Sequence, residues 1–189
     1  MTEAGTPRRL VVGISGASGV IYGVRALEML RVLGIETHLI FTPAAQITLA
    51  HETDLKVAAV EALADKVYRP NDIGAAVSSG SFKTMGMLVA PCSIRSLSEI
   101  AHGVTGSLLP RAADVALKER RRVVLLVRES PLHAGHLKSM LAASEMGAIV
   151  APPVPAFYTR PQSIEAMVDH TVGRALDLFG LNVDIPRWS

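Results

Sequence analysis

The sequence predicts an α/β fold: a three-layer open parallel sheet with helices on both faces, of the flavodoxin or Rossmann-like type. Short apolar runs alternate with segments of helical periodicity along the chain. Hydrophobic residues make up 49% of the sequence and aromatic residues only 4%, so the core is built from Ala, Val, Leu and Ile, which suits parallel strands covered by helices. A chain of 189 residues is long enough for one such domain and short for two, so we expect residues 1–189 to form a single domain.

The first strand and the turn after it carry the clearest signal. Residues 10–14 form a continuous apolar run, as in a buried parallel strand, and the turn Ser15–Gly19 follows it. A helix then begins at Val20, because apolar residues recur at intervals of three and four up to Leu33. Glycines and hydroxyls ahead of a helix N-terminus favour a bound anion. We therefore predict that this turn holds a phosphate group.

The same turn excludes two common nucleotide classes. A dinucleotide fingerprint needs glycine at three positions, and Ile14 stands at the first of them, ahead of Gly16 and Gly19. No acidic residue follows the second strand to bind a ribose hydroxyl. An ATP-binding loop needs lysine after its last glycine, where this chain has Val20. A hydroxyl-lined turn suits a single phosphate, such as that of flavin mononucleotide (FMN).

Helices and strands continue to alternate after the first helix. Pro91-Cys92-Ser93 is expected to end the third strand, and Pro152–Tyr158 to be extended, because proline does not fit a helix interior. Ser96 and Glu99 have capping-box spacing, and Ser130-Pro131 is typical of a helix start. The further strands are expected at residues 37–41, 87–90, 123–127 and 148–151, and the further helices at residues 43–50, 55–64, 94–101, 108–121, 130–146 and 163–179.

Polar residues follow four of the predicted strands. Because ligands of open parallel sheets bind outside the carboxyl ends of the strands, these segments are expected to converge on one site. They are Ser15–Gly19, Phe41-Thr42, Pro91–Arg95 and Arg128-Glu129.

Composition excludes several other classes of protein. The net charge of +2 is too small to indicate nucleic-acid binding, and a single cysteine rules out an intrachain disulfide framework. No stretch of 18 apolar residues is present, and residues 1–9 are polar, so we expect neither a membrane span nor a secretory signal. We therefore expect a cytoplasmic protein.

The spaced motifs together resemble the UbiX/Pad1 flavin prenyltransferases, and the likeness runs from about Arg9 to Trp188. This resemblance implies synthesis of prenylated FMN from reduced FMN and dimethylallyl phosphate, as the cofactor of a UbiD-type decarboxylase in pathways such as ubiquinone biosynthesis. It also implies a homododecamer with sites between subunits. The motifs are Gly16–Gly19, Ser79–Phe82, Pro91–Ser93, Arg111–Val115 with Leu117–Arg120, Arg128-Glu129, and Pro152-Pro153 with Phe157-Tyr158.

The resemblance also implies roles for single residues. Ser18 and Glu52 would relay protons near the reacting flavin nitrogen, and Glu129 would assist there. Thr42 keeps the hydroxyl of a position where the family often has serine. The flavin would be bound by Gly16, Ala17, Ser18, Thr42, Ser93, Ile94, Arg95, Ser96 and Arg128, and the prenyl phosphate by Arg111, Lys118, Tyr158 and Arg174.

The chemistry calls for the same kinds of residue. Arg, Lys and Tyr can neutralise a leaving monophosphate, and no Asp pair is present to hold Mg²⁺, so we expect no metal. An allyl cation gains from nearby aromatic faces, for which Tyr158 and Trp188 are candidates. Asp114 lies one helical turn from both Arg111 and Lys118, so a structural ion network remains an alternative for this group.

Other interpretations stay open. Cys92 could be a nucleophile, although a lone cysteine is more often a small buried apolar residue. His133 and His136 have a spacing that a metal could use, but the sequence places no further ligand beside them. At the level of function, the alternatives are a flavin-dependent cysteine decarboxylase and a non-catalytic FMN-carrying subunit of an aromatic acid decarboxylase.

Overall fold

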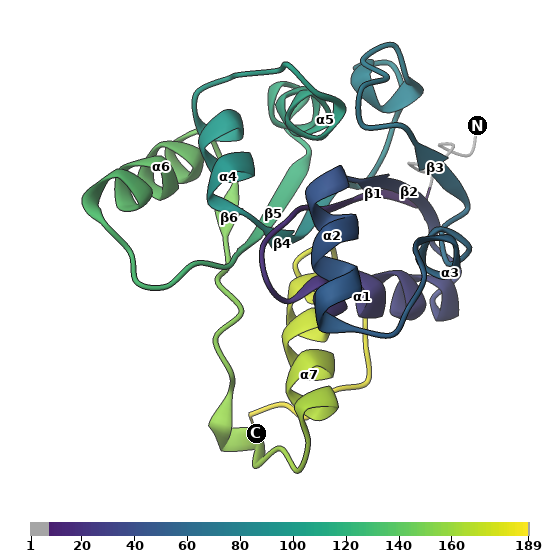
Figure 1. Ribbon diagram of the computed structural model, residues 1–189, viewed down its shortest axis with the longest axis vertical. Coiled ribbons are helices and arrows are strands. Elements are labelled where there is room, and N and C mark those ends of the chain that lie inside the picture. The colour runs from purple at the N-terminus through teal and green to yellow at the C-terminus, as the bar shows by residue number, and fades with distance from the viewer. Residues whose placement is uncertain (1–7, 189) are drawn as a thin grey trace, which may run out of the picture.

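The computed structural model describes residues 8–188, and its centre is a six-stranded parallel sheet (Figure 1). Hydrogen-bonded neighbours follow the order β3-β2-β1-β4-β5-β6, so the strand order reverses between β1 and β4. In open sheets this reversal marks the ligand-binding crevice. The strands are β1 (Arg9–Ile14), β2 (Glu36–Phe41), β3 (Lys66–Tyr68), β4 (Gly86–Cys92), β5 (Arg122–Val127) and β6 (Ile149–Val150).

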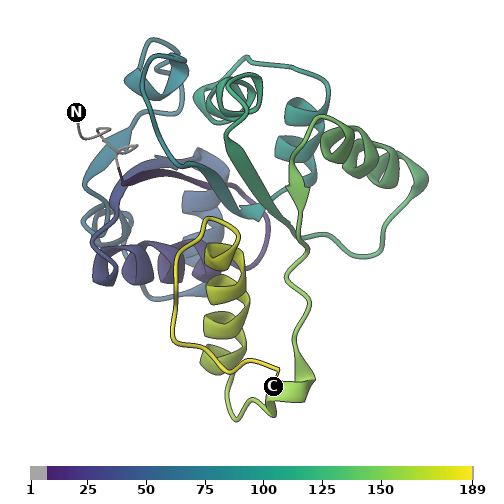
Figure 2. The same cartoon turned by 180° about the vertical axis from the view of Figure 1, so that it is seen from behind.

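Helices cover both faces of the sheet, which confirms the predicted three-layer α/β class. On one face, α1 (Val20–Val32) packs against α7 (Ile164–Asp177) (Figure 2). Arg25 of α1 binds both carboxylate oxygens of Asp169 at 2.5 and 3.1 Å. On the other face, α4 (Ile94–Ala101) packs against α5 (Leu108–Lys118) and α6 (Ala134–Glu145). Two buried apolar clusters, one for each face, form the core.

Two segments leave this layered body. After β2 the chain forms α2 (Pro43–Glu52) and α3 (Val57–Glu61) before the edge strand β3. After β6 it runs away from the sheet as an extended segment to the 3₁₀ helix η2 (Phe157–Thr159), and α7 brings it back (Figures 1 and 2). The C-terminal residues return along α7 to lie beside η2.

The structure corrects the predicted strands in two places. The edge strand β3 was missed, because it is three residues long and Lys66 and Val67 are exposed, so it lacks the apolar run of its neighbours. Strand β4 continues through Pro91 to Cys92 instead of ending at Ala90. The Pro91 carbonyl accepts hydrogen bonds from the Ser15 N–H at 3.2 Å and hydroxyl at 2.8 Å, so the missing proline N–H does not end the strand.

Helix starts were also misjudged. Helix α6 begins at Ala134, where the His133 ring accepts a hydrogen bond from the Gly135 N–H, and not at Ser130-Pro131. Helix α4 is capped by Ser93, whose hydroxyl accepts from the Ser96 N–H at 3.2 Å. The expectation that Ser96 caps this helix was therefore wrong, because the capping residue is Ser93, one turn earlier. The extended prediction for residues 152–158 holds up to Ala156, and η2 begins at Phe157.

Candidate functional site

The turn after β1 is tied firmly to the end of β4. Ser15 is buried, donates its hydroxyl to the Pro91 carbonyl and accepts from the Ser93 N–H at 2.7 Å. The Ser15 hydroxyl therefore both donates and accepts within the chain, so Ser15 shapes this turn and is not a free phosphate ligand. Gly16 is required by close packing, because a Cβ there would lie 2.4 Å from the Ala44 Cβ of α2.

Glu52, the last residue of α2, occupies the N-terminus of α1. Its carboxylate accepts from the Gly19 N–H at 2.9 and 3.1 Å and from the Val20 N–H at 3.1 Å. The positive end of the helix dipole is thereby neutralised within the chain. A phosphate bound at these N–H groups, as the sequence predicts, would have to displace Glu52. The contact also brings Glu52 beside the exposed Ser18, its predicted partner.

A first cavity of about 260 Å³ opens at the strand reversal, and we call it the crevice. The N-terminal residues of three helices, α2, α4 and α5, line it. Helix N-termini present free N–H groups and positive partial charge, so three of them favour an anion such as a phosphate. Predicted flavin ligands that line it are Gly16, Thr42, Ser93, Arg95 and Ser96, and the sequence analysis missed Ser107 and Asn71, which also line it.

The side chains in the crevice are already ordered. The Thr42 hydroxyl accepts from the Ala45 N–H at 3.2 Å and so caps α2. Arg95 is exposed and its guanidinium binds Glu99 at 2.9 Å, also in the crevice. The donor set of serine hydroxyls, helix N–H groups and one arginine fits the phosphate of FMN.

Two further predicted residues lie at the end of β5, outside the lining of the crevice. The backbone N–H of Arg128 donates to the Cys92 carbonyl at 3.0 Å, which holds this strand end beside β4. Burial raises the pKa of the Tyr22 hydroxyl, and the Arg128 guanidinium opposes this with a smaller effect. The Glu129 carboxylate accepts from the neighbouring Ser130 N–H at 3.0 Å.

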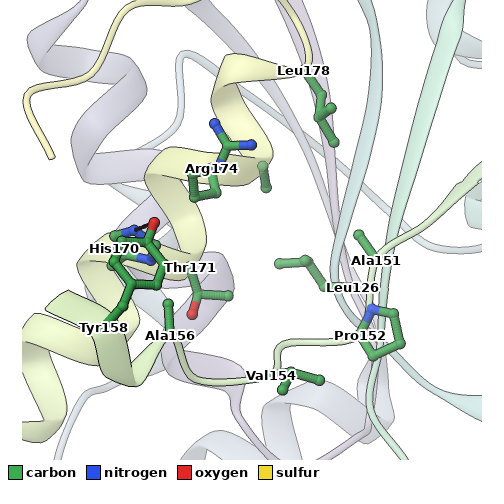
Figure 3. A pocket seen from close by; sticks show the side chains of 11 residues that line it. Leu126, Ala151, Pro152, Val154, Ala156, Tyr158, His170, Thr171, Arg174 and Leu178 are labelled. Carbon is green, nitrogen blue, oxygen red and sulfur yellow. Dashed lines mark hydrogen bonds between the residues drawn. The ribbon is translucent and has the colours of Figure 1, made fainter. Parts of the chain in front are cut away.

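A second cavity, of about 330 Å³, lies between α7 and the extended segment after β6, and we call it the arm cavity (Figure 3). Tyr158 and Arg174 both line it, so the structure brings together two of the four predicted phosphate ligands. The Tyr158 ring meets Trp188 edge-on, with centroids 5.3 Å apart. The cavity is therefore lined by a guanidinium and a phenol, and the indole of Trp188 packs against the phenol ring.

Arg174 is held in place by Asp177. Its guanidinium binds one Asp177 carboxylate oxygen at 2.6 Å, and Arg187 binds both oxygens at 2.7 and 2.9 Å. Hydrogen bonds from Arg187, and with a smaller effect from Arg174, hold the pKa of Asp177 below its ordinary value against the raising effect of burial. The carboxylate thus stays charged and keeps Arg174 in a fixed place.

The other two predicted phosphate ligands lie elsewhere in the chain. Both are on α5, across the sheet from α7. Arg111 binds Asp114 at 3.0 Å, whereas Lys118 binds Glu119 at 2.5 Å, so Asp114 serves one base and not both. A single chain does not bring the four residues together.

The alternative chemical candidates find little support. Cys92 is fully buried, and burial raises the pKa of its thiol well above the ordinary value, which keeps it protonated. The ring centroids of His133 and His136 lie 3.5 Å apart, so the two rings pack against each other. Within residues 8–188 no group of three or more His, Cys, Asp or Glu side chains could hold a metal ion. No helix in that range is long and apolar enough to cross a membrane.

Comparisons with known proteins agree with this geometry. The Flavoprotein family model matches residues 2–176. Flavin prenyltransferase UbiX of Escherichia coli (strain K12) is 57% identical over 185 residues, 96% of this chain and 98% of the relative. A probable UbiX-like flavin prenyltransferase of Bacillus subtilis (strain 168) is 52% identical over 99% of this chain and 92% of the relative.

Solved structures match as well. The crystal structure of AnUbiX (PadA1) in complex with FMN and dimethylallyl pyrophosphate has a TM-score of 0.95 and 49% identity, over 96% of this chain and 97% of that one. A dodecameric FMN-dependent Ubix-like decarboxylase from Escherichia coli O157:H7 has a TM-score of 0.94 and 46% identity, over 96% and 99%. Because sequence and structure agree over nearly the full length, the chain belongs to the UbiX flavin prenyltransferase family of flavoproteins.

Proposed function

We propose that this protein is a flavin prenyltransferase, in which residues 1–189 form one FMN-binding unit. It joins the dimethylallyl group of a dimethylallyl phosphate ester to reduced FMN. The observation that carries the proposal is the crevice at the strand reversal, which the N-terminal residues of three helices line. The relative AnUbiX binds both FMN and a dimethylallyl ester, which supports the same pair of ligands here.

FMN would be held by the crevice, with its phosphate at the N-termini of α4 and α5. Ser93, Arg95 and Ser96 supply N–H, guanidinium and hydroxyl donors there. The flavin ring supplies the nucleophilic centre when bound. Ala17, Ser18 and Ile94 would contact it mainly through the backbone, and Arg128 would face it from the end of β5.

Glu52 and Ser18 would handle the proton at the reacting nitrogen. The Glu52 carboxylate is fixed by three N–H contacts at the first turn of α1, one residue from Ser18. A carboxylate held beside a hydroxyl can receive a proton through it, which is the arrangement general-base catalysis needs. Glu129 lies on the same edge of the sheet and would assist there.

The arm cavity would hold the leaving phosphate. Arg174 neutralises the charge that develops as the allylic bond breaks, and Tyr158 donates a hydrogen bond to the same group. Trp188 and the Tyr158 ring offer aromatic faces to the allyl fragment, whose positive charge they attract. We infer that Arg111 and Lys118 reach this phosphate from another copy of the chain, in a homododecamer like that of the Escherichia coli O157:H7 relative.

The product would serve as the cofactor of a UbiD-type decarboxylase, with ubiquinone biosynthesis among the pathways this would supply. A cytoplasmic location suits an enzyme that depends on reduced FMN. The non-catalytic carrier is the weaker alternative, because a carrier has no use for the guanidinium and phenol of the arm cavity.

Mass spectrometry of the flavin tests the proposal. The protein is incubated anaerobically with reduced FMN and either dimethylallyl phosphate or dimethylallyl diphosphate. We expect the flavin to gain the mass of one dimethylallyl group, and EDTA to leave the yield unchanged, since no carboxylate cluster in the described residues could hold a divalent ion. Unmodified flavin with both esters would reject the prenyltransferase in favour of a carrier, and Mg²⁺-dependent recovery after EDTA would reject metal independence.

A further inference from the structure

His170 is a buried polar residue to which no role has yet been given. It lies on α7, is only 7% exposed and lines the arm cavity with Arg174, one turn further along the helix (Figure 3). Its Nε2 lies 3.2 Å from the Tyr158 hydroxyl, and the two rings meet edge-on with centroids 5.7 Å apart. Among residues 8–188, Tyr158 is its one hydrogen-bond partner.

The Tyr158 ring contacts two other rings. Trp188 packs edge-on against it with centroids 5.3 Å apart, and His170 meets it edge-on at 5.7 Å. The hydroxyl is therefore delivered to the same cavity as Arg174 by a packed ring rather than by a free side chain (Figure 3). With the ring in this position, the direction of the hydroxyl proton decides what the hydroxyl offers to the cavity.

Which side chain donates in the hydrogen bond between His170 and Tyr158 decides whether the Tyr158 hydroxyl can donate to a phosphate. A tyrosine hydroxyl has one proton to donate and lone pairs to accept with, and a neutral histidine has one donor and one acceptor nitrogen. If His170 Nε2 accepts, the Tyr158 proton is used inside the protein, and the cavity sees only lone pairs that repel an anion. If Nε2–H donates, the Tyr158 proton is free to donate to a phosphate oxygen. Charge-assisted bonds of this kind are roughly twice as strong as neutral ones.

We propose that His170 is a positioning residue for phosphate recognition: its Nε2–H donates to the Tyr158 oxygen, so that the hydroxyl proton points at the phosphate of the prenyl substrate. This inference rests on the proposed function, in which the arm cavity holds that phosphate. His170 acts through Tyr158 and does not itself touch the substrate.

The test compares His170→Phe, which keeps a ring of similar shape but has no nitrogen, with His170→Gln, which retains an amide donor. If the His170→Phe protein does not fold, His170→Met takes its place. Methionine and glutamine are both unbranched, and only glutamine carries a donor. We expect His170→Phe or His170→Met to raise the KM for dimethylallyl phosphate roughly tenfold. We expect His170→Gln to stay nearer to wild type and the dissociation constant of FMN to be unchanged in every variant.

A double-mutant cycle with Tyr158→Phe tests whether His170 acts through the Tyr158 hydroxyl. If His170 works through the Tyr158 hydroxyl, adding His170→Phe to Tyr158→Phe raises KM no further, because the group it orients is gone. Effects that multiply in the double variant would mean a general structural role and would overturn the inference. So would a wild-type KM in His170→Phe.

His38→Phe is the matched control. His38 is also buried and its Nδ1 lies 2.9 Å from the Tyr68 hydroxyl, but Tyr68 belongs to the core cluster on the other face of the sheet. The His38→Phe variant should have a lower melting temperature and an unchanged KM for dimethylallyl phosphate. Failure of the wild-type protein to prenylate FMN would refute the proposed function itself, whereas an active enzyme with a wild-type KM in His170→Phe refutes only the role of His170.

Discussion

The crevice and the arm cavity are built in opposite ways. The crevice is made by helix starts and strand ends at one edge of the sheet, and its polar groups are mostly backbone N–H groups and short hydroxyls. The arm cavity is made by side chains of α7 and an extended segment that leaves the sheet. Five of the nine predicted flavin ligands line the first, whereas the second holds two of the four predicted phosphate ligands.

The difference teaches how each ligand can be recognised. A site made of backbone at a strand reversal is placed by the fold of one chain. A site made of long charged side chains on separate elements depends on which surfaces meet. We therefore expect changes in the arm cavity to alter turnover and changes in the crevice to alter FMN binding and stability.

Arg174→Ala should give the largest effect. The variant removes a preorganised charge from the arm cavity, so prenylation should fall roughly 10²-fold or more, the scale for losing one such stabiliser. FMN binding should be unchanged, because Arg174 does not line the crevice. Stopped-flow turnover and FMN titration on the same variant measure both. Near-normal turnover would remove Arg174 from the site, and lost FMN affinity would assign it to the other ligand.

Saturating FMN should stabilise the fold. At one hundred times the dissociation constant the gain is about 2.7 kcal/mol. For a chain of this size this corresponds to roughly 5–10 °C in melting temperature. Tyr158→Phe should keep the full shift, because Tyr158 belongs to the arm cavity. An unchanged melting temperature in wild type would show that the crevice does not bind FMN.

Ser15→Ala should weaken the frame of the crevice. The change leaves the part-buried Ser93 N–H without the acceptor it now has and removes one donor from the Pro91 carbonyl. The cost should be about 1–3 kcal/mol in the free energy of unfolding, with weaker FMN binding. Denaturant titration with and without FMN gives both quantities. As a control, Ser163→Ala removes a hydroxyl cap from the start of α7, and wild-type FMN affinity is expected there. Equal FMN affinity in Ser15→Ala and wild type would contradict the role of this clamp.

The smallest of the four predicted effects should be the loss of stability at low pH that comes from Asp177. The pKa of Asp177 is held below its ordinary value, so its ion pairs contribute stability above the unfolded pKa of about 3.9. That contribution is lost as the pH falls through the lowered folded-state pKa. Asp177→Asn should therefore melt a few degrees below wild type at pH 7, and the gap should close as the pH falls below the ordinary carboxyl pKa and through the lowered pKa of Asp177. A gap that stays constant with pH would mean that the charge of Asp177 adds nothing.

Local signals in the sequence were enough for most of the fold. Apolar runs and helical periodicity predicted five of the six strands and the alternation of layers, because burial of a parallel strand or helix face is written in neighbouring residues. Helix starts were less certain, as Ser130-Pro131 and Ser96 show, since several nearby groups compete to cap the same N–H groups. The short strand β3 has no such pattern, and only its pairing with β2 defines it.

Tertiary structure alone decided how the site groups are used. Glu52 reaches the Gly19 and Val20 N–H groups from 33 and 32 residues away, and His170 finds Tyr158 across the turn between η2 and α7. The separation of Arg111 and Lys118 from Tyr158 and Arg174 likewise comes from the sheet that lies between α5 and α7. Sequence spacing fixes which face of one helix a residue occupies, but the packing of whole elements fixes which side chains meet. The chemistry of this protein therefore depends on contacts that no single segment encodes.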